Sequence, residues 1–318
     1  MNVKANLNPE VQRRHNWRNW LHTVILIIGT ALLAAAIAWI VYGPDGLIWA
    51  AISGGIGLWV LSRISPKVVL TLYKARALDG HELPEIHDLM RTLTKRADLP
   101  AVPRLYYVPS QMLNAFAVGK AGDSAIAITD GLLRTMNLRQ IAGILAHEVS
   151  HIRNGDLRVM GLADVLNRIT GFMSTMGLIG IPLAFGTGWH IPLGGLILLI
   201  FAPTIGGLLQ LALSRSREYD ADLDGVTLTG DPEGLASALA LLDRRQRAVW
   251  EGLVLPGSRV PEPSMLRTHP ATADRIAKLL ALRRETSRAM PGIEPSSSFN
   301  ITPPRTPRIH WHRFGIWY

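Results

Sequence analysis

The sequence contains no cysteine among its 318 residues. The chain therefore forms no disulfide bond and offers no thiolate to a metal ion, so any metal site must use histidine and carboxylate side chains. Charge is also scarce, since charged residues make up 18% of the chain while hydrophobic residues make up 48%. This composition is unusual for a soluble domain, and it predicts membrane-spanning segments.

Acidic residues are fewer than basic ones, 24 against 33, which gives a formal net charge of +9. An excess of Lys and Arg is typical of proteins that bind nucleic acid or anionic lipid, and of the cytoplasmic face of membrane proteins. The sequence has no segment in which basic and aromatic residues alternate as in nucleic-acid-binding modules. We therefore predict a lipid bilayer as a partner and no nucleic acid. The lack of cysteine also fits a reducing compartment.

Two long runs lack charged side chains almost entirely. Residues 21–41 have no acidic or permanently basic side chain and are long enough to cross a bilayer as a helix. A turn at 42–46 and a shorter apolar run at 47–62 follow. Residues 169–213 form a second apolar block with Gly and Pro near its middle. We therefore predict two transmembrane hairpins, 21–62 and 169–213, with about four transmembrane helices in total.

Both predicted hairpins have alternatives. Residues 36–38 resemble a signal-peptide cleavage site, although apolar sequence continues beyond them. Residues 169–213 could instead form a buried hydrophobic hairpin of a globular domain. Basic residues flank both blocks, whereas the two hairpin turns carry only Asp45 and His190. Because short loops rich in Lys and Arg stay in the cytoplasm, everything outside the membrane is predicted to face that side.

The rest of the chain divides by composition. Residues 1–20 form a basic N-terminus, and residues 63–168 and 214–285 are predicted to be two parts of one domain that the second hairpin interrupts. Residues 286–318, rich in Pro, Ser and Arg, are predicted to be mostly disordered. Apolar residues recur at helical spacing at 82–99, 138–153, 234–250 and 271–285, and strand-like runs lie at 104–109, 114–119 and 124–129.

Residues 147–151 read HEVSH and lie in the predicted helix at 138–153. Helical residues four apart share one face, so His147 and His151 can both reach one zinc ion. Glu148 can hold the zinc-bound water, whose pKa falls towards about 7, and can take its proton. The motif predicts metal-assisted peptide hydrolysis, although three polar residues on a helix also produce this pattern by chance.

A catalytic zinc needs a third protein ligand and an open fourth position. Without cysteine, the stretch REYDAD at 217–222 supplies the candidate, Glu218. Asp222 shares its helix face and can accept a hydrogen bond from the second ring nitrogen of a ligand imidazole. An ordinary acidic helix start is the alternative. A membrane hairpin at 169–213 would return the chain to the same side, and we expect the helices of the site to continue into membrane helices.

Four stretches in this order, NAFAVG, HEVSHIRNGD, SRSREYDAD and THPATADR, resemble the HtpX family of membrane zinc metalloproteases, which are relatives of the CAAX prenyl proteases. The resemblance runs from about Arg63 to Leu282. It implies a mainly α, polytopic membrane protein with a zincin-like domain, in which a small β-sheet lies beside the active-site helix. It also implies one zinc ion per chain, protein or peptide substrates, and quality control of membrane proteins in the bacterial inner membrane.

The resemblance further implies roles for single residues. His147, His151 and Glu218 are the implied zinc ligands, and Glu148 is the implied general base. An edge strand along the cleft is implied to pair with the substrate backbone through Asn114, Ala115, Phe116 and Ala117. Stabilisation of the oxyanion and organisation of the site are implied for His269 and Arg275. Asp156 fits the family pattern after the second histidine, with an orienting or helix-capping role.

Two rival functions are open at this point. One is a catalytically silent membrane scaffold that keeps zinc for stability, against which Glu148 argues because a structural site does not need that carboxylate. The other is a prenyl-protein protease, for which about four spans are few. The ligand set His, His and Glu would also accept cobalt or manganese.

Overall fold

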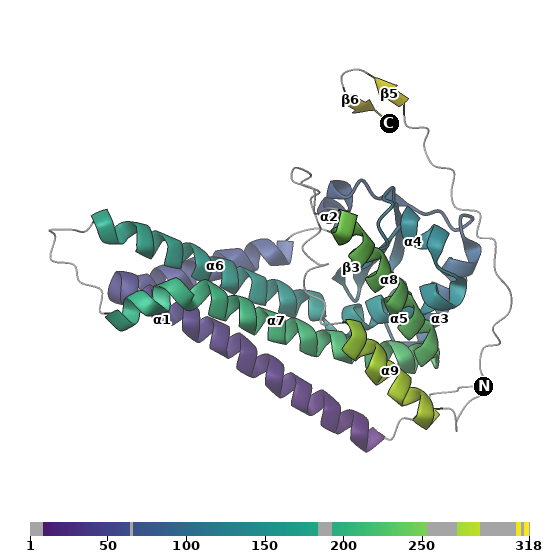
Figure 1. The fold of residues 1–318 in the computed structure, drawn as a ribbon, viewed down its shortest axis with the longest axis horizontal. Coiled ribbons are helices and arrows are strands. Elements are labelled where there is room, and N and C mark those ends of the chain that lie inside the picture. Colours follow the sequence, from purple (N-terminus) through teal and green to yellow (C-terminus); the bar gives the residue numbers. More distant parts are fainter. Residues whose placement is uncertain are drawn as a thin grey trace.

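The computed structural model describes residues 9–63, 66–183, 193–252, 272–286, 310–312 and 315–317. Within them the chain forms an elongated bundle of apolar helices and a globular part that contains a small sheet (Figure 1). The mainly α fold with a small sheet is confirmed. Helices α6 (Asp156–Leu183) and α7 (Leu193–Thr229) extend from the bundle to the globular part.

The bundle consists of α6, α7 and the long helix α1 (Pro9–Arg63). Gly43, with φ 63° and ψ −150°, breaks the helical path of α1 immediately before Pro44. Only glycine adopts such a conformation readily, and α1 doubles back at this point (Figure 1). Its first arm packs on α7 near Gly29 and its second arm packs on α6 near Gly57. The predicted turn at 42–46 therefore corresponds to this break.

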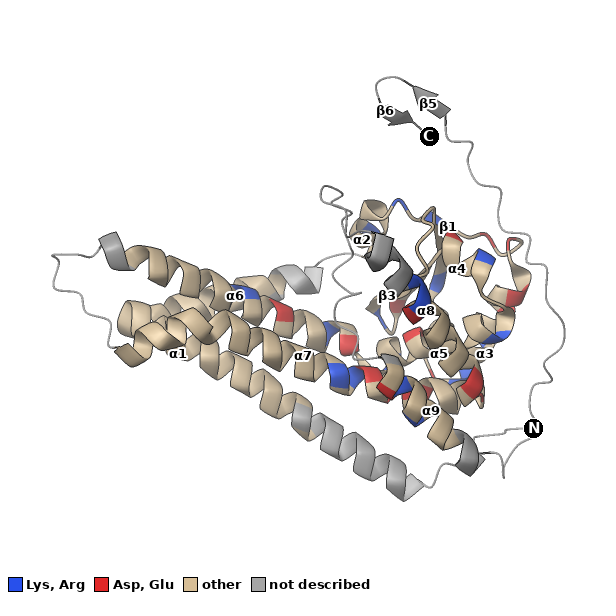
Figure 2. Ribbon diagram, viewed as in Figure 1, with Lys and Arg blue, Asp and Glu red and all other residues tan. Residues whose placement is uncertain are grey.

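The outer surface of the bundle is apolar. Large hydrophobic side chains stand exposed on all three helices, for example Ile48 (58%), Phe172 (66%) and Leu208 (61%). Charged residues are rare along its length and frequent in the globular part (Figure 2). Two stretches among the described residues, Thr23–Gly57 and Leu193–Thr229, are long and apolar enough to cross a membrane. These features fit a membrane protein, and the four separate crossings stay a prediction.

The globular part contains a four-stranded sheet in the order β1-β2-β4-β3. Strand β2 pairs parallel with β4, and β3 pairs antiparallel with β4 and forms one edge. Side chains alternate between the two sheet faces, so Ile126 and Ile128 face the main core while Ala125 and Ala127 face a smaller cluster. The three predicted strands are confirmed; the observed bounds are β1 (Arg76–Ala77), β2 (Arg104–Val108), β3 (Ala115–Lys120) and β4 (Asp123–Thr129).

Helix α5 (Leu138–Asn154) lies between the sheet and helices α7 and α8. Asn137 and Gln140 form a capping box at its start, and its core side is buried. The other helices are α2 (Pro66–Leu72), α3 (Pro84–Arg96), α4 (Asp130–Thr135), α8 (Pro232–Gly252) and α9 (Thr272–Thr286). The four predicted helices at 82–99, 138–153, 234–250 and 271–285 are thereby confirmed.

The connection between the HEVSH helix and the bundle differs from expectation. Gly155 ends α5 in the left-handed conformation, with φ 69°, and Asp156 begins a new helix. The active-site helix is therefore not continuous with α6. Helix α7, in contrast, runs without interruption from the bundle through Glu218 to Thr229. Both helices of the second predicted hairpin also extend beyond the expected limits of 169–213.

The C-terminal tail is predicted to be mostly disordered, and two short strands are described at its end. Strands β5 (His310–His312) and β6 (Gly315–Trp317) form a two-stranded antiparallel sheet. Trp311 and Ile316 are opposite each other in this register, and an aromatic residue facing a β-branched residue favours such pairing. The stretch with His269 lies outside the described residues.

Candidate metal centre

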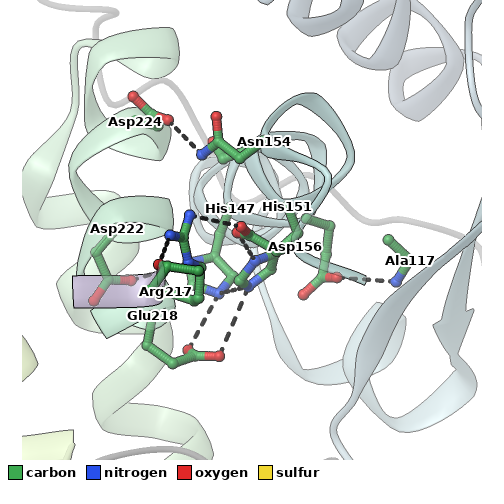
Figure 3. A network of polar contacts seen from close by, with 12 residues as sticks. Ala117, His147, His151, Asn154, Asp156, Arg217, Glu218, Asp222 and Asp224 are labelled. Atoms are coloured by element: carbon green, nitrogen blue, oxygen red, sulfur yellow. Dashed lines mark hydrogen bonds and ion pairs between the residues drawn. The ribbon is translucent and has the colours of Figure 1, made fainter. Parts of the chain in front are cut away.

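Three side chains from two helices converge beside the sheet. His147 and His151 come from α5, and Glu218 comes from α7 (Figure 3). The Nε2 atoms of the two histidines lie 3.1 Å apart. Glu218 faces both of them, with Oε2 at 3.4 Å from Nε2 of His147 and Oε1 at 3.7 Å from Nε2 of His151. One donor atom from each residue lies within 4.8 Å of the others.

This geometry fits a single metal ion. Two nitrogen ligands of a tetrahedral zinc, each about 2.0–2.1 Å from the ion, lie about 3.3 Å apart, which is close to the separation of the two Nε2 atoms. The three side chains are 4%, 8% and 2% exposed, in the order His147, His151 and Glu218. Buried nitrogen and carboxylate donors facing one point are the donor set of a divalent transition metal.

A glycine lets the two helices approach closely enough to form this site. A Cβ atom on Gly225 of α7 would lie 3.2 Å from the backbone N of His147, which is tighter than ordinary packing. Glycine therefore permits α7 to lie against α5 at the first histidine. No role for Gly225 was predicted from the sequence. Its position within the otherwise helical stretch DADLDGVTL is the signal that indicates a close approach.

Each histidine is held from behind by a carboxylate. His147 Nδ1 lies 3.0 Å from Oδ1 of Asp222, and His151 Nδ1 lies 2.8 Å from Oδ2 of Asp156. A carboxylate at Nδ1 favours the tautomer that carries its proton there, which leaves the Nε2 lone pair free to face a metal ion. The structure thus places Asp222 and Asp156, both singled out in the sequence, against one histidine each.

Two arginines in turn hold these carboxylates. Arg275 of α9 donates from Nε and Nη2 to the two oxygens of Asp222, at 2.7 and 2.6 Å, and its Nη1 lies 2.9 Å from Oε2 of Glu218. Arg217 of α7 donates to Oδ1 of Asp156 at 3.2 Å (Figure 3). It also donates a hydrogen bond to the hydroxyl of Thr23 in α1. Arg217 directly precedes Glu218 in the sequence, but no part in the site was predicted for it.

Glu148 lies on the sheet side of the centre. It is half-buried, and its Oε2 accepts a hydrogen bond of 2.9 Å from the backbone N–H of Ala117 in β3. A carboxylate next to the first histidine, on the side of an edge strand, is placed to contact both a metal-bound water and a substrate that lies along that strand. The arrangement is that expected of an HExxH hydrolase.

The chain is similar in sequence to known proteases. The sequence profile of peptidase family M48 matches residues 81–283. The protease HtpX homolog of Aquifex aeolicus is 34% identical over 80% of this chain and 89% of its own, and that of Acaryochloris marina is 34% identical over 85% and 97%. The crystal structure of S. mikatae Ste24p gives a TM-score of 0.47 at 18% identity, over 82% of this chain and 66% of that chain. The chain belongs to peptidase family M48. It is an HtpX-type metalloprotease.

The electrostatics of the M48 centre favour positive charge. Burial lowers the pKa of His147, but hydrogen bonds and charge interactions with Asp222 and Glu218 outweigh it and raise the pKa to about 10. Burial likewise opposes protonation of His151, yet Asp156 and Glu218 raise its pKa. Without a metal the pocket therefore attracts protons, and metal binding has to displace them. The same negative potential stabilises a bound divalent cation.

Strand β3 is the edge strand beside the centre, and part of its backbone points away from β4. Thr129 N–H donates to the carbonyl of Asn114 at 3.0 Å, so residues 114 and 116 turn their backbone groups towards β4. Those of Ala115 and Ala117 then point away from β4, towards the side on which Glu148 lies. The side chain of Phe116 is buried on the opposite sheet face, 4.9 Å from Tyr73 between ring centroids, and does not reach the site.

Proposed function

We propose that this M48 protein is a membrane-embedded zinc endopeptidase in which His147, His151 and Glu218 hold one zinc ion and Glu148 is the general base. The convergence of both Nε2 atoms and the Glu218 carboxylate, with Glu148 on the side of the edge strand, carries the proposal. A zinc ion held there supplies a Lewis acid that polarises the scissile carbonyl and lowers the pKa of the attacking water.

The protein groups then divide the remaining work. Glu148 takes a proton from the attacking water and passes it to the leaving amine, which completes hydrolysis of the peptide bond. The outward-facing backbone of Ala115 and the carbonyl of Ala117 align an extended substrate by strand addition, while the Ala117 N–H holds Glu148. Asp222 and Asp156 keep the two imidazoles oriented. Arg275 anchors Asp222 and Glu218, while stabilisation of the oxyanion by His269 or Arg275 is proposed from the family resemblance.

The exposed apolar surface of α1, α6 and α7 supports a location in the bilayer. We place the enzyme in the bacterial inner membrane with four crossings, at 21–62 and 169–213, and with residues 63–168 and 214–285 forming one cytoplasmic protease domain. The distribution of Lys and Arg supports this orientation. Membrane proteins are the proposed substrates and their quality control is the proposed role, because the active site is attached directly to the bundle.

Purified, zinc-loaded protein incubated with casein or a model membrane protein tests the activity, with Glu148→Gln as the matched variant. We expect cleavage by the wild type, a loss of about 10²–10⁴-fold in the variant, and equal zinc content in both. Equal cleavage by both proteins would remove Glu148 from the mechanism. No cleavage by either, with zinc bound, would identify a scaffold. Exclusive cleavage of farnesylated peptides would identify a prenyl-protein protease.

A further inference from the structure

A cavity of about 300 Å³ opens directly beside the metal centre. One wall is the turn between β3 and β4, at residues 119–122, and the other is the junction between α5 and α6, from His151 to Arg158. Several lining residues are small, namely Gly119, Ala121, Gly122 and Gly155. Gly119 and Gly155 have φ of 97° and 69°, conformations that side-chain-bearing residues rarely adopt. Nothing in the mechanism proposed above uses this cavity.

The lining of this cavity is basic. Lys120, Arg153 and Arg158 belong to it, and its other members carry no carboxylate. Arg153 is 3.7 Å from Asp224, so part of its charge is compensated. Lys120 and Arg158 are exposed, and within the described part of the chain neither forms an ion pair. Two uncompensated cations beside one space attract an anionic group.

The cavity lies where a substrate side chain can reach it. Glu148 of α5 contacts β3 at Ala117, and β3 ends three residues later at Lys120. Three residues of extended chain span about 10 Å. A substrate strand that pairs with β3 and has its scissile bond at the metal centre would therefore place a residue within three positions of that bond over the cavity. His151 lines the same cavity, which connects it to the metal centre.

We propose that this cavity is a specificity subsite that binds an acidic side chain of the substrate, within three residues of the scissile bond, through Lys120 and Arg158. The inference rests on the proposed endopeptidase function and adds the substrate class: peptides and protein segments that carry Asp or Glu near the cleavage point. The carboxylate forms ion pairs with the two basic side chains, and the surrounding small residues accommodate its stem.

Peptides that differ only by Glu or Gln at each of the positions flanking the scissile bond test the subsite in the zinc-loaded enzyme. We expect kcat/KM to favour Glu by about tenfold at one position, because exposed ion pairs each contribute up to roughly fivefold. Lys120→Gln/Arg158→Gln abolishes this preference while retaining cleavage of the Gln peptides. Lys95→Gln, a matched exposed lysine outside the cavity, leaves the preference intact.

Two further measurements separate a charge subsite from a structural effect. In about 1 M salt, where the screening length is roughly 3 Å, the Glu preference falls towards unity in the wild type. Lys120→Glu/Arg158→Glu reverses the preference, so that Lys is favoured at the position that Glu occupied. A preference that survives both changes, or no acidic preference at any position, overturns the inference.

A binding assay separates failure of the subsite from failure of the proposed function. Glu148→Gln, loaded with zinc, is titrated with fluorescent Glu and Gln peptides in neutral phosphatidylcholine nanodiscs and in nanodiscs that also contain phosphatidylglycerol. Tighter binding of the Glu peptide, lost in the double Gln variant, supports the subsite even without turnover. Equal binding in neutral discs, with phosphatidylglycerol association that depends on Lys120 and Arg158, assigns the cavity to lipid headgroups and overturns the inference.

Discussion

The bundle and the globular part differ in the kind of buried polar group that they contain. In the bundle, buried hydroxyls donate to backbone carbonyls, as Thr30 does to Leu26 O and Thr170 does to Leu166 O, both at 2.8 Å, and as Ser174 does to Leu199 O of the neighbouring helix. In the globular part, buried charges gather around one point, and the carboxylates of Asp156 and Asp222 each contact both an arginine and a histidine. The first pattern suits a medium without water, and the second builds a site.

The difference shows how the two parts depend on each other. Removing one partner of a buried ion pair destabilises a protein by about 3–5 kcal/mol, because the remaining charge is buried away from water and unpaired. The charges at the metal centre therefore persist only while α5, α6, α7 and α9 keep their relative positions. Since α6 carries Asp156 and α7 carries Glu218, packing in the bundle fixes where both residues lie. Helix packing in the bundle therefore also positions residues of the centre.

The strongest test of the comparison removes a metal ligand and leaves the bundle untouched. Glu218→Ala is expected to lower zinc affinity by well over 100-fold, more than loss of an outer partner, and to abolish proteolysis. Because α7 makes its apolar contacts elsewhere, helical content in circular dichroism should stay at the wild-type level. Zinc analysis after dialysis measures the effect, with the exposed Glu85→Ala as control. Full zinc occupancy in Glu218→Ala would show that the ligand set is wrong.

A matched pair of substitutions tests whether lipid covers the bundle while water covers the globular part. Ile200 in the bundle is 52% exposed and Leu280 of α9 in the globular part is 43% exposed. If lipid covers only the bundle, Ile200→Arg costs about 2.5–3.5 kcal/mol of membrane insertion, whereas Leu280→Arg costs little. The fraction of each protein recovered in carbonate-washed membranes measures this. Equal recovery of the two variants would contradict a lipid-covered bundle.

Arg217 offers a test of the connection between the two parts. It joins Asp156, behind His151, to Thr23 of α1. Arg217→Ala leaves a buried carboxylate with one partner fewer, and we expect zinc affinity to fall by about 10–100-fold. Arg217→Lys should restore part of this loss, since it returns the charge. Thr23→Val removes only the contact with α1; if zinc affinity is unchanged there but falls in Arg217→Ala, α1 has no part in positioning the site.

Local patterns in the sequence predicted much of this architecture. The HEVSH spacing placed His147 and His151 on one helix face, and the absence of cysteine narrowed the third donor to a carboxylate such as Glu218. Period-two alternation located the strands. These features depend on neighbours along the chain, and the structure brings the three metal-binding candidates together.

The features that the sequence did not predict depend on contacts between helices that are far apart along the chain. A glycine within a helical stretch indicates a close approach at Gly225, but nothing local indicates that His147 is the neighbour or that Arg217 reaches both Asp156 and Thr23. The break between α5 and α6 had a local signal in Asn154-Gly155-Asp156, where a helix-ending glycine precedes a helix-starting aspartate. The expectation of a continuous helix overlooked it because apolar periodicity resumes so soon afterwards.

The smallest expected effect comes from a partly exposed ion pair of the globular part. Asp231 directly precedes α8, accepts a hydrogen bond from the Gly234 N–H at 3.0 Å and pairs with Arg139. Burial raises the pKa of Asp231, but the Arg139 guanidinium and the backbone N–H groups outweigh it and lower the pKa. The ionised Asp231 therefore contributes fully to stability above the pKa of the unfolded state, about 3.9. This contribution is lost as the pH falls through the lower pKa of Asp231 in the folded state.

Asp231→Asn keeps the capping side chain and removes only the charge, so we expect a loss of about 1 kcal/mol or less at pH 7. The difference from the wild type should shrink in acid, where Asp231 is protonated in both the folded and the unfolded protein. Thermal unfolding in detergent at pH 7 and at low pH measures it, with the buried-pair variant Arg217→Ala as reference. If Asp231→Asn lowers stability at pH 7 as much as Arg217→Ala does, then burial does not determine how much an ion pair of this protein contributes to stability.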